Sequence, residues 1–196
     1  EPPGYAPRVS TRLHMTLVAV TAFLVMGQVS KLRAWVDGSV PPTPEVGDLL
    51  VARPGRVDAT FDKTLVLVVE KNDRGTTGLV INRRTPPPHL GFVAWPEDEG
   101  WGGPLQPDAR FVLAPAKFPG ATWVGDGIWY ANTAGRAVPE GSRRFRGWAG
   151  WVPGQLEAEV AAGGWLVLPA RPEQVFGGEP SWAEVVAASM REAFAG

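Results

Sequence analysis

The sequence predicts an α+β domain with a largely antiparallel sheet, preceded by a single transmembrane helix. Short apolar runs rich in β-branched residues, separated by turns that draw on the 24 Gly and 20 Pro, indicate the sheet. Two amphipathic runs in the second half of the chain indicate helices, and this mixture is typical of the α+β class. A long uncharged run near the N-terminus indicates the membrane helix. The 196 residues therefore accommodate one domain and one appendage.

The N-terminal segment is predicted to be an arm followed by the membrane helix. Residues 1–12 are Pro-rich and lack apolar periodicity, so an extended arm is expected. Residues 13–29 contain no Asp, Glu, Lys or Arg, and their apolar side chains cover every face of a helix. At about 1.5 Å per residue, a helix over residues 13–36 exceeds the roughly 30 Å of bilayer hydrocarbon. A buried core helix stays open as the alternative, whereas no A-x-A-like pattern follows that would indicate a cleaved signal peptide.

Basic and aromatic residues mark the ends of the predicted membrane helix, where their polar tips reach the interface. The residues expected to contact the membrane or a partner are Arg12, Leu17, Phe23, Leu24, Lys31, Arg33 and Trp35. Because basic residues flank both ends, the positive-inside rule does not set the orientation. Residues 37–47, rich in Pro and Gly, are expected to form a linker, and residues 48–196 form the domain.

The domain is expected to open with strands. LLVARP at residues 49–54 is followed by two β-branched runs at residues 64–70 and 77–82, and the turn signal KNDRGT between the last two predicts a buried hairpin. Residues 86–100 are expected to be irregular. Strand-like runs then continue with GGPLQ, RFVLAP, GIWYANT and, later, WLVLPA.

Two helices complete the predicted domain. In GQLEAEVAA, at residues 154–162, Leu156 and Val160 share one face, and the following Gly-Gly pair predicts the helix end. Ser181 and Glu184 have the spacing of a capping box, which predicts a second helix running towards the C-terminus.

The composition excludes several classes of site. The chain has no cysteine, so disulfides, thiolate nucleophiles and Cys-ligated zinc are excluded, and with only His14 and His89 a multi-histidine metal site or a Ser-His-Asp triad is disfavoured. The formal net charge of -1 lacks the positive field that nucleic-acid binding requires, so no nucleic-acid partner is expected. We therefore predict no catalytic residue, no metal site and no cofactor. The 9 Trp favour membrane or protein interfaces.

The motifs from residue 48 to residue 188 closely resemble the YqgE/AlgH family. The resemblance rests on LLVARPGRVDATFDKTLVLVVEKNDRGTTGLVINR, then GGPL, then GWAGWVPGQLEAEVAAGGWLVLPA and VFGGEPSWAEVV, in this order. It implies a compact bacterial domain with a bent sheet flanked by helices and no established enzymatic activity. This chain departs from the family's usual pattern by its additional N-terminal residues and by Arg53, where an apolar residue is more usual.

The family motif permits a structural and a functional interpretation. Glycines in it allow close backbone approach and unusual conformations, Pro153 is tolerated near a helix start, and the Trp residues supply burial. Alternatively, Gln155 and Glu157 line a pocket that faces the GGP loop, whose amides could hold an anion. The candidate residues are Gly102, Gly103, Pro104, Gly147, Gly150, Trp151, Pro153, Gly154, Gln155 and Glu157.

Two further groups of charged residues are candidates for a site. Asp58 and Asp62 could form an acid pair, but capping or solvated carboxylates at a turn are the more usual explanation. The arginines of SRRFRG, at residues 142–147, could contact lipid phosphates or an acidic partner, but a solvated loop is the more usual explanation.

These observations favour a non-catalytic accessory subunit that docks on a larger bacterial inner-membrane complex, for example a photosynthetic or respiratory one. Its expected partners are integral membrane subunits and the lipid bilayer, with a single span. The resemblance places the domain on the cytoplasmic face. A membrane-tethered regulator linked to transcriptional control is the alternative, and an enzyme using Glu157 with Asp58 ranks third.

Overall fold

The computed structural model describes residues 41–91, 94–132 and 137–195, and the side chains up to residue 191. The predicted arm, the predicted membrane helix with its seven contact residues, and residues 37–40 of the predicted linker lie outside these ranges. The chain divides into two compact units, of which the larger comprises residues 40–182. Within the described ranges, no helix is both long and apolar enough to cross a membrane.

The larger unit is built on one sheet, which has nine strands among the described residues. Along the sheet the order is β6-β7-β5-β8-β3-β2-β1-β9, and β4 pairs separately with β8. The strands are β1 (Asp48–Ala52), β2 (Leu65–Asn72), β3 (Gly75–Val80), β4 (Glu99–Trp101), β5 (Leu105–Ala114), β6 (Thr122–Gly125), β7 (Ile128–Asn132), β8 (Arg143–Trp151) and β9 (Trp165–Pro169). All neighbours are antiparallel except β4 and β8, so the predicted, largely antiparallel sheet is confirmed.

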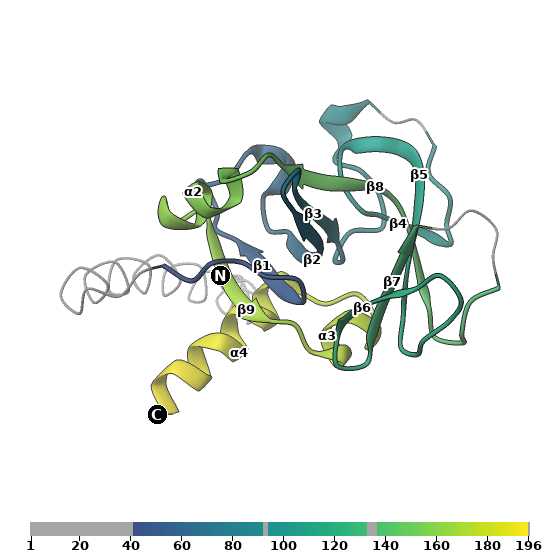
Figure 1. Ribbon diagram of the computed structural model, residues 1–196. Coiled ribbons are helices and arrows are strands. Elements are labelled where there is room, and N and C mark those ends of the chain that lie inside the picture. Colours follow the sequence, from purple (N-terminus) through teal and green to yellow (C-terminus); the bar gives the residue numbers. More distant parts are fainter. Residues whose placement is uncertain (1–40, 92–93, 133–136, 196) are drawn as a thin grey trace, which may run out of the picture. The chain divides into compact units, whose positions relative to one another are not determined.

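The sheet bends at β8, which takes part in both of its halves. The first half of β8 lies between β5 and β4, and its last residues pair with β3, with Thr76 opposite Trp151. Gly147, at the junction, has a φ of 69°, which a residue with a side chain rarely adopts. The sheet curls far enough for β6 to lie beside the start of β1 (Figure 1), where a Cβ on Gly47 would lie 2.5 Å from the carbonyl oxygen of Val124.

The helices are short and few in the larger unit: α2 (Gln155–Ala161), α3 (Pro172–Phe176) and the single 3-10 turns η1 (Ala59–Phe61) and η2 (Pro88–Leu90). The helix α4 (Trp182–Ala195) starts directly after Ser181, as predicted, and lies almost entirely in the smaller unit. The helix predicted at residues 154–162 is confirmed, since α2 buries Leu156 and Val160. The prediction that helices flank the sheet is therefore confirmed only in part, because the helices described in the larger unit are short.

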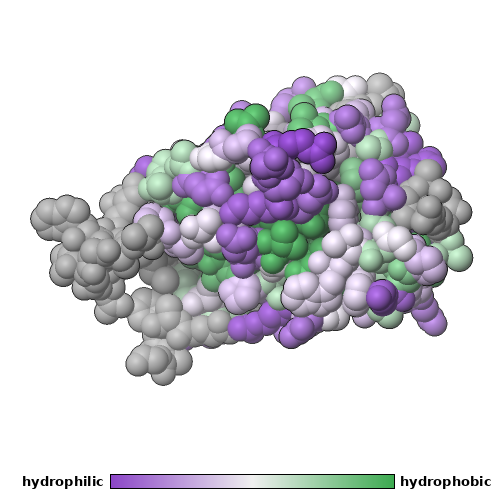
Figure 2. Space-filling model, in the orientation of Figure 1, coloured by the Kyte–Doolittle hydropathy of each residue, from purple (hydrophilic) through white to green (hydrophobic). Residues whose placement is uncertain are grey.

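Both faces of the central strands are buried. One face contributes Leu50, Val66 and Val80 to a cluster that α2 and the aromatic side chains of Trp151 and Trp165 complete. The alternate residues of β1, β2 and β3 point the other way and are also fully buried: Leu49, Val51, Leu65, Leu67 and Leu79. Burial on two faces explains why these runs are continuously apolar instead of alternating. Figure 2 shows that some apolar atoms remain visible between hydrophilic ones on one side of the molecule.

Several elements differ from the prediction. The stretch at residues 86–100 is not wholly irregular, because it contains η2 and the start of β4. GGPLQ is not a strand in itself, since Gly102, Gly103 and Pro104 form the connection between β4 and β5. The predicted hairpin is confirmed as β2 and β3. The strands β6 and β8 and the helix α3 were not predicted. The first and the last are too short to carry a periodic pattern, whereas β8 is rich in Arg and Gly and lacks a run of β-branched residues.

Candidate functional site

The GGP loop, residues 102–104, is hydrogen-bonded to strands of the sheet. The amide of Gly102 donates a hydrogen bond to the carbonyl oxygen of Arg146 at 2.8 Å, and the Gly102 carbonyl accepts one from the amide of Val80, also at 2.8 Å. Gly103 has a φ of 152°, and a Cβ there would collide with the backbone of Trp148 and Ala149. The loop therefore lies directly on β8, and the Gly102 amide is already engaged instead of being free for an anion.

The glycines of β8 allow two different close approaches. A Cβ on Gly147 would collide with the carbonyl oxygen of Gly103, so this position lets the GGP loop reach the strand. A Cβ on Gly150 would collide with the six-membered ring of Trp148, which lies across it. Packing thus requires glycine at both Gly147 and Gly150.

The partly buried carboxylate of Glu159 joins two Trp residues of the core. Oε2 of Glu159 accepts hydrogen bonds from Nε1 of Trp151 at 3.0 Å and from Nε1 of Trp165 at 2.8 Å. The ring of Phe61 contacts both indoles, with centroid distances of 6.4 Å and 5.9 Å. A carboxylate that satisfies two buried indole donors fixes their rings and avoids the cost of unpaired polar groups. Glu159 was missed from the sequence because its partners lie on β8 and β9, beyond α2 itself.

The start of α2 is braced by Gln155. Its side-chain oxygen accepts a hydrogen bond from the amide of Val152 at 3.1 Å, and its Nε2 donates to Oε1 of Glu159 at 2.9 Å. Gly154 precedes the helix with a φ of 79°, and Pro153 and Gly154 are both exposed. Gln155 therefore ties the chain before α2 to the first turn of the helix and supports Glu159, which favours its structural interpretation.

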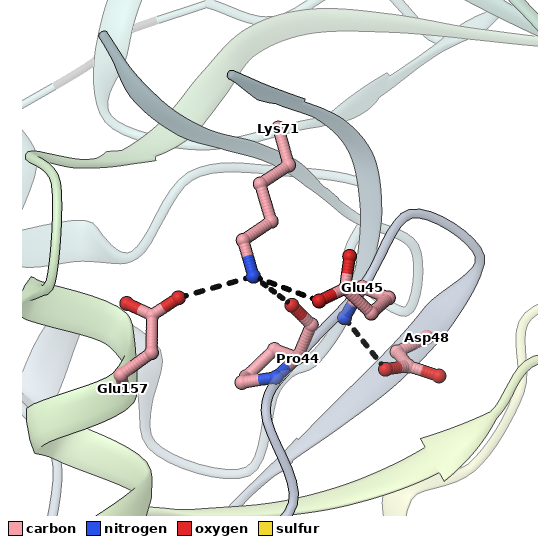
Figure 3. Close-up of polar contacts among 5 residues, drawn as sticks. All are labelled: Pro44, Glu45, Asp48, Lys71 and Glu157. Atoms are coloured by element: carbon pink, nitrogen blue, oxygen red, sulfur yellow. Dashed lines mark hydrogen bonds and ion pairs between the residues drawn. The ribbon is translucent and has the colours of Figure 1, made fainter. Parts of the chain in front are cut away.

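Glu157 takes part in a second polar group, which we call the Lys71 clasp: Pro44, Glu45, Lys71 and Glu157. Nζ of Lys71 donates to the carbonyl oxygen of Pro44 at 2.6 Å and to Oε1 of Glu45 at 3.1 Å, and it pairs with Oε1 of Glu157 at 3.1 Å (Figure 3). One ammonium group thereby connects the segment before β1, the strand β2 and the helix α2. The predicted linker is consequently fixed to the domain at its C-terminal end.

The charges of the clasp stabilise one another. Burial disfavours the charged ammonium of Lys71, but the hydrogen bonds to Glu45 and Glu157 outweigh this effect and raise its pKa. The pKa of Glu157 is lowered by a hydrogen bond from its own backbone amide and, against the opposing effect of burial, by Lys71. The Lys71 side chain is 23 % exposed and that of Glu157 is 35 % exposed, so water screens the pair in part.

The predicted candidate residues therefore separate into two groups of contacts. Gly102 and Gly103 of the GGP loop meet β8 at Gly147 and Trp148, whereas Gln155 and Glu157 make their polar contacts with Val152, Glu159 and Lys71. Within the ranges that the structure describes, no hydrogen bond or ion pair links the GGP loop to Gln155 or Glu157. No cluster of His, Asp and Glu among the described residues could hold a metal ion.

The three arginines of SRRFRG have three different environments. Arg143 donates to the carbonyl oxygens of Val175 and Ile81, at 2.7 Å and 2.8 Å, and burial lowers its pKa. Arg146 pairs with Glu99 at 3.0 Å and lies 5.9 Å from the ring centroid of Trp95. Arg144 is exposed. These residues lie in a strand, so a solvated loop is the wrong description of the run.

The remaining polar candidates are structural. Asp58 caps η1 by accepting from the amide of Thr60 at 2.8 Å, which supports a capping role over an acid pair. Nη1 of the buried Arg53 donates to the carbonyl oxygen of Gly163 at 3.1 Å and so ties the end of β1 to the end of α2.

Residues 49–193 match the family described as DUF179: AlgH-like. The chain belongs to this AlgH-like family. A UPF0301 protein of Streptomyces avermitilis is 34% identical over 186 residues, covering 80% of this chain and 93% of the relative. A UPF0301 protein of Chlorobium luteolum is 32% identical over 148 residues, covering 68% of this chain and 78% of the relative.

Two solved structures share the AlgH-like fold. The AlgH protein from Pseudomonas aeruginosa superimposes with a TM-score of 0.58 at 31% identity, covering 76% of this chain and 90% of that structure. Protein DIP2367 from Corynebacterium diphtheriae superimposes with a TM-score of 0.62 at 24% identity, covering 76% of this chain and 89% of that structure. The curled, largely antiparallel sheet is thus the fold of the family.

Proposed function

We propose that this AlgH-like protein is a non-catalytic accessory subunit that docks on a bacterial inner-membrane complex, such as a photosynthetic or respiratory one. In this proposal residues 13–36 form a single-pass anchor, and residues 48–196 lie on the cytoplasmic face. The Lys71 clasp is the observation that carries the proposal. It fixes the chain at Pro44 and Glu45, directly before the first strand.

The clasp supports a role in which the domain is held in a defined orientation. A Pro- and Gly-rich linker that is free along its whole length lets a domain rotate about its anchor. Here the last residues of the linker are bound to β2 and α2, so the free length is shortened. A subunit that docks on a fixed partner loses less entropy on binding when its linker is already partly immobilised. A tethered enzyme or regulator that meets mobile partners gains little from an immobilised linker.

The polar groups of the family motif also support this proposal. Glu157 is bound to Lys71, Gln155 to the start of α2, and Glu159 to two indoles. Each of these groups contributes to the architecture of the domain, which suits a protein whose function lies in its surface.

The test is purification of the tagged full-length chain from native membranes in mild detergent, followed by mass spectrometry of the proteins that remain bound. We expect a stoichiometric set of integral membrane subunits. In Leu24→Arg the charge at the centre of the predicted span costs about 2.5–3.5 kcal/mol, so we expect this chain in the supernatant without partners, while Leu24→Ile behaves as the wild type. Recovery of the wild-type chain alone would overturn the proposal. If deletion also changed transcript levels while every membrane complex stayed intact, the regulatory alternative would take its place.

A further inference from the structure

One face of β8 displays a partly exposed aromatic ring. Phe145, Gly147, Ala149 and Trp151 point into the protein, and the alternate residues point outward. We use the name Trp148 face for Arg144 and Trp148 on β8, Val152 directly after the strand, and Leu105, which lies opposite Trp148 on β5. Arg146, between Arg144 and Trp148, is held against Glu99 and Trp95. Leu105 is 41% exposed and Val152 is 66% exposed.

The ring of Trp148 is held in place on this face. It lies across Gly150, which has no side chain to displace it, and Leu105 contacts the same position from the other side. Its Nε1 donates to the side-chain oxygen of Gln106 at 3.3 Å. Gln106 itself adopts a φ of 46°, a conformation that L-residues adopt at a cost. A ring fixed before binding loses little entropy when a partner covers it.

Burial does not explain the position of Trp148. The indoles of Trp101, Trp151, Trp165 and Trp182 are all buried, whereas that of Trp148 is partly exposed and lies opposite the exposed Leu105. Pre-positioned Trp and Arg residues surrounded by apolar contacts are typical of the residues that dominate binding energy in protein interfaces.

The charge beside the Trp148 face is positive. Glu99 accepts ion pairs from both Arg146 and Arg110, at 3.0 Å and 3.4 Å, and the only further acid of this cluster, Asp108, is 3.9 Å from Arg146. Arg144 is exposed, and among the described residues no carboxylate pairs with its guanidinium. Arg144 can therefore pair with an acidic group of a partner.

We infer that the Trp148 face binds a segment of a partner protein in which an apolar side chain is flanked by Asp or Glu. The apolar side chain covers Trp148 between Leu105 and Val152, and the carboxylate pairs with Arg144. This inference rests on the proposed function and names the surface through which the accessory subunit docks. A protein segment is favoured over a lipid headgroup because the centre of the face is aromatic and aliphatic, and its cation lies at the edge.

The test uses the full-length chain in its native membrane. A photo-crosslinking amino acid is placed at position 148 and, as the control, at position 123, whose Trp is 55% exposed on β6. We expect position 148 to crosslink to a subunit that co-purifies with the chain, through a peptide that contains Asp or Glu, and position 123 to give no such product. Arg144→Glu should reduce the partner that co-purifies by at least about tenfold, whereas Arg74→Glu, at an exposed position in the hairpin turn, should not.

Reversing the charge of the crosslinked acid, Asp or Glu to Lys, should restore binding to the Arg144→Glu chain. Co-purification of the complex at wild-type levels with Arg144→Glu, and no crosslink from position 148, would overturn this inference while leaving the proposed function intact. Absence of any partner from the wild-type chain would instead overturn both. Binding of the purified chain to phosphatidylglycerol vesicles that is lost in Arg144→Glu, without a protein crosslink, would assign the face to a membrane surface and overturn the protein partner.

Discussion

Glu157 forms an ion pair within the domain through its carboxylate, although the sequence suggested that it lines a pocket. Its carboxylate lies on α2, and its partner Lys71 comes from a strand far away in the sequence. Sequence spacing relates residues within one helix or strand, so it could single out Glu157 as part of the motif but could not name Lys71. The same limit applies to Glu159, whose two indole donors lie on different strands.

We expect Glu157→Gln to lower the free energy of unfolding by about 0.5–1 kcal/mol at neutral pH, the range for a partly exposed ion pair. The folded state lowers the pKa of Glu157, so this contribution is present above its ordinary value of 4.5 and is lost as the pH falls through the folded pKa. The pKa of Lys71 is raised, so the contribution persists up to its ordinary value of 10.5 and is lost at higher pH.

Urea unfolding of the wild type and of Glu157→Gln at pH 7 and pH 3 measures this difference. The exposed Glu173, in the first turn of α3, provides the matched control Glu173→Gln. A difference that stayed equal at both pH values would contradict an electrostatic role for Glu157.

Glu159→Gln tests the carboxylate that joins the core indoles. The amide keeps one acceptor oxygen, but its NH2 group faces a donor, either an indole N–H or Nε2 of Gln155. We expect a loss of roughly 1–3 kcal/mol and a changed near-ultraviolet circular dichroism of the Trp residues. Glu140→Gln, at an exposed turn, should leave both unchanged. An unaltered Trp signal in Glu159→Gln would show that the carboxylate does not orient the rings.

At the scale of elements, the contact between the GGP loop and β8 explains two motifs that lie far apart in the sequence. Gly102 and Gly103 belong to one motif and Gly147 to the other, and each is small because the other backbone approaches it. The sequence indicated that these glycines allow close approach, but it could not tell which strand approaches which loop. The long apolar runs predicted β1, β2 and β3, since burial on two faces leaves a strong signal. The short strands β4 and β6 gave no comparable signal.

Gly103→Ala is expected to lower the free energy of unfolding by roughly 2–4 kcal/mol, because both its φ of 152° and the nearby backbone of Trp148 oppose a Cβ. Gly55→Ala is the matched control: its φ is 70°, but no atom lies within 4 Å of the added Cβ. This control should cost only about 1 kcal/mol. Chemical denaturation of both variants separates backbone strain from collision, and equal losses would contradict the close approach at Gly103.

At the scale of the larger unit, Tyr130 reports whether the curled sheet unfolds as a whole. Burial, with a smaller effect from Glu70, raises the pKa of Tyr130 well above its ordinary value of 10.0. The phenol is therefore neutral in the folded protein at a pH where the unfolded chain ionises it, so stability declines as the pH rises above about 10. In an alkaline titration we expect the phenolate absorbance of Tyr130 to appear together with loss of the β-sheet signal. Tyr130→Phe identifies the absorbance step, and ionisation before unfolding would contradict the burial.

The antiparallel class, the hairpin and the helix α2 were predicted from the sequence, because each depends on a local pattern of apolar residues and turns. The order of the strands along the sheet could not be predicted, since it is decided by contacts between distant segments. The Lys71 clasp and the Trp148 face both follow from that order. Residue types in the motifs thus indicated where packing is tight, and the strand order determined which surfaces and ion pairs result.

The pairing of β1 with β9 leaves β1 without one of its partner strands during most of protein synthesis. Asp48 lies opposite Pro169 and Ala52 opposite Trp165, so one edge of β1 has no partner until residues 165–169 have emerged from the ribosome. During this interval β1 can pair with β2 alone, and its other edge exposes unpaired amides beside Leu49, Leu50 and Val51. An unpaired apolar edge of this kind recruits other nascent strands. Synthesis that stops before Trp165 consequently yields an aggregation-prone product, and a chaperone that covers β1 until β9 emerges would prevent this.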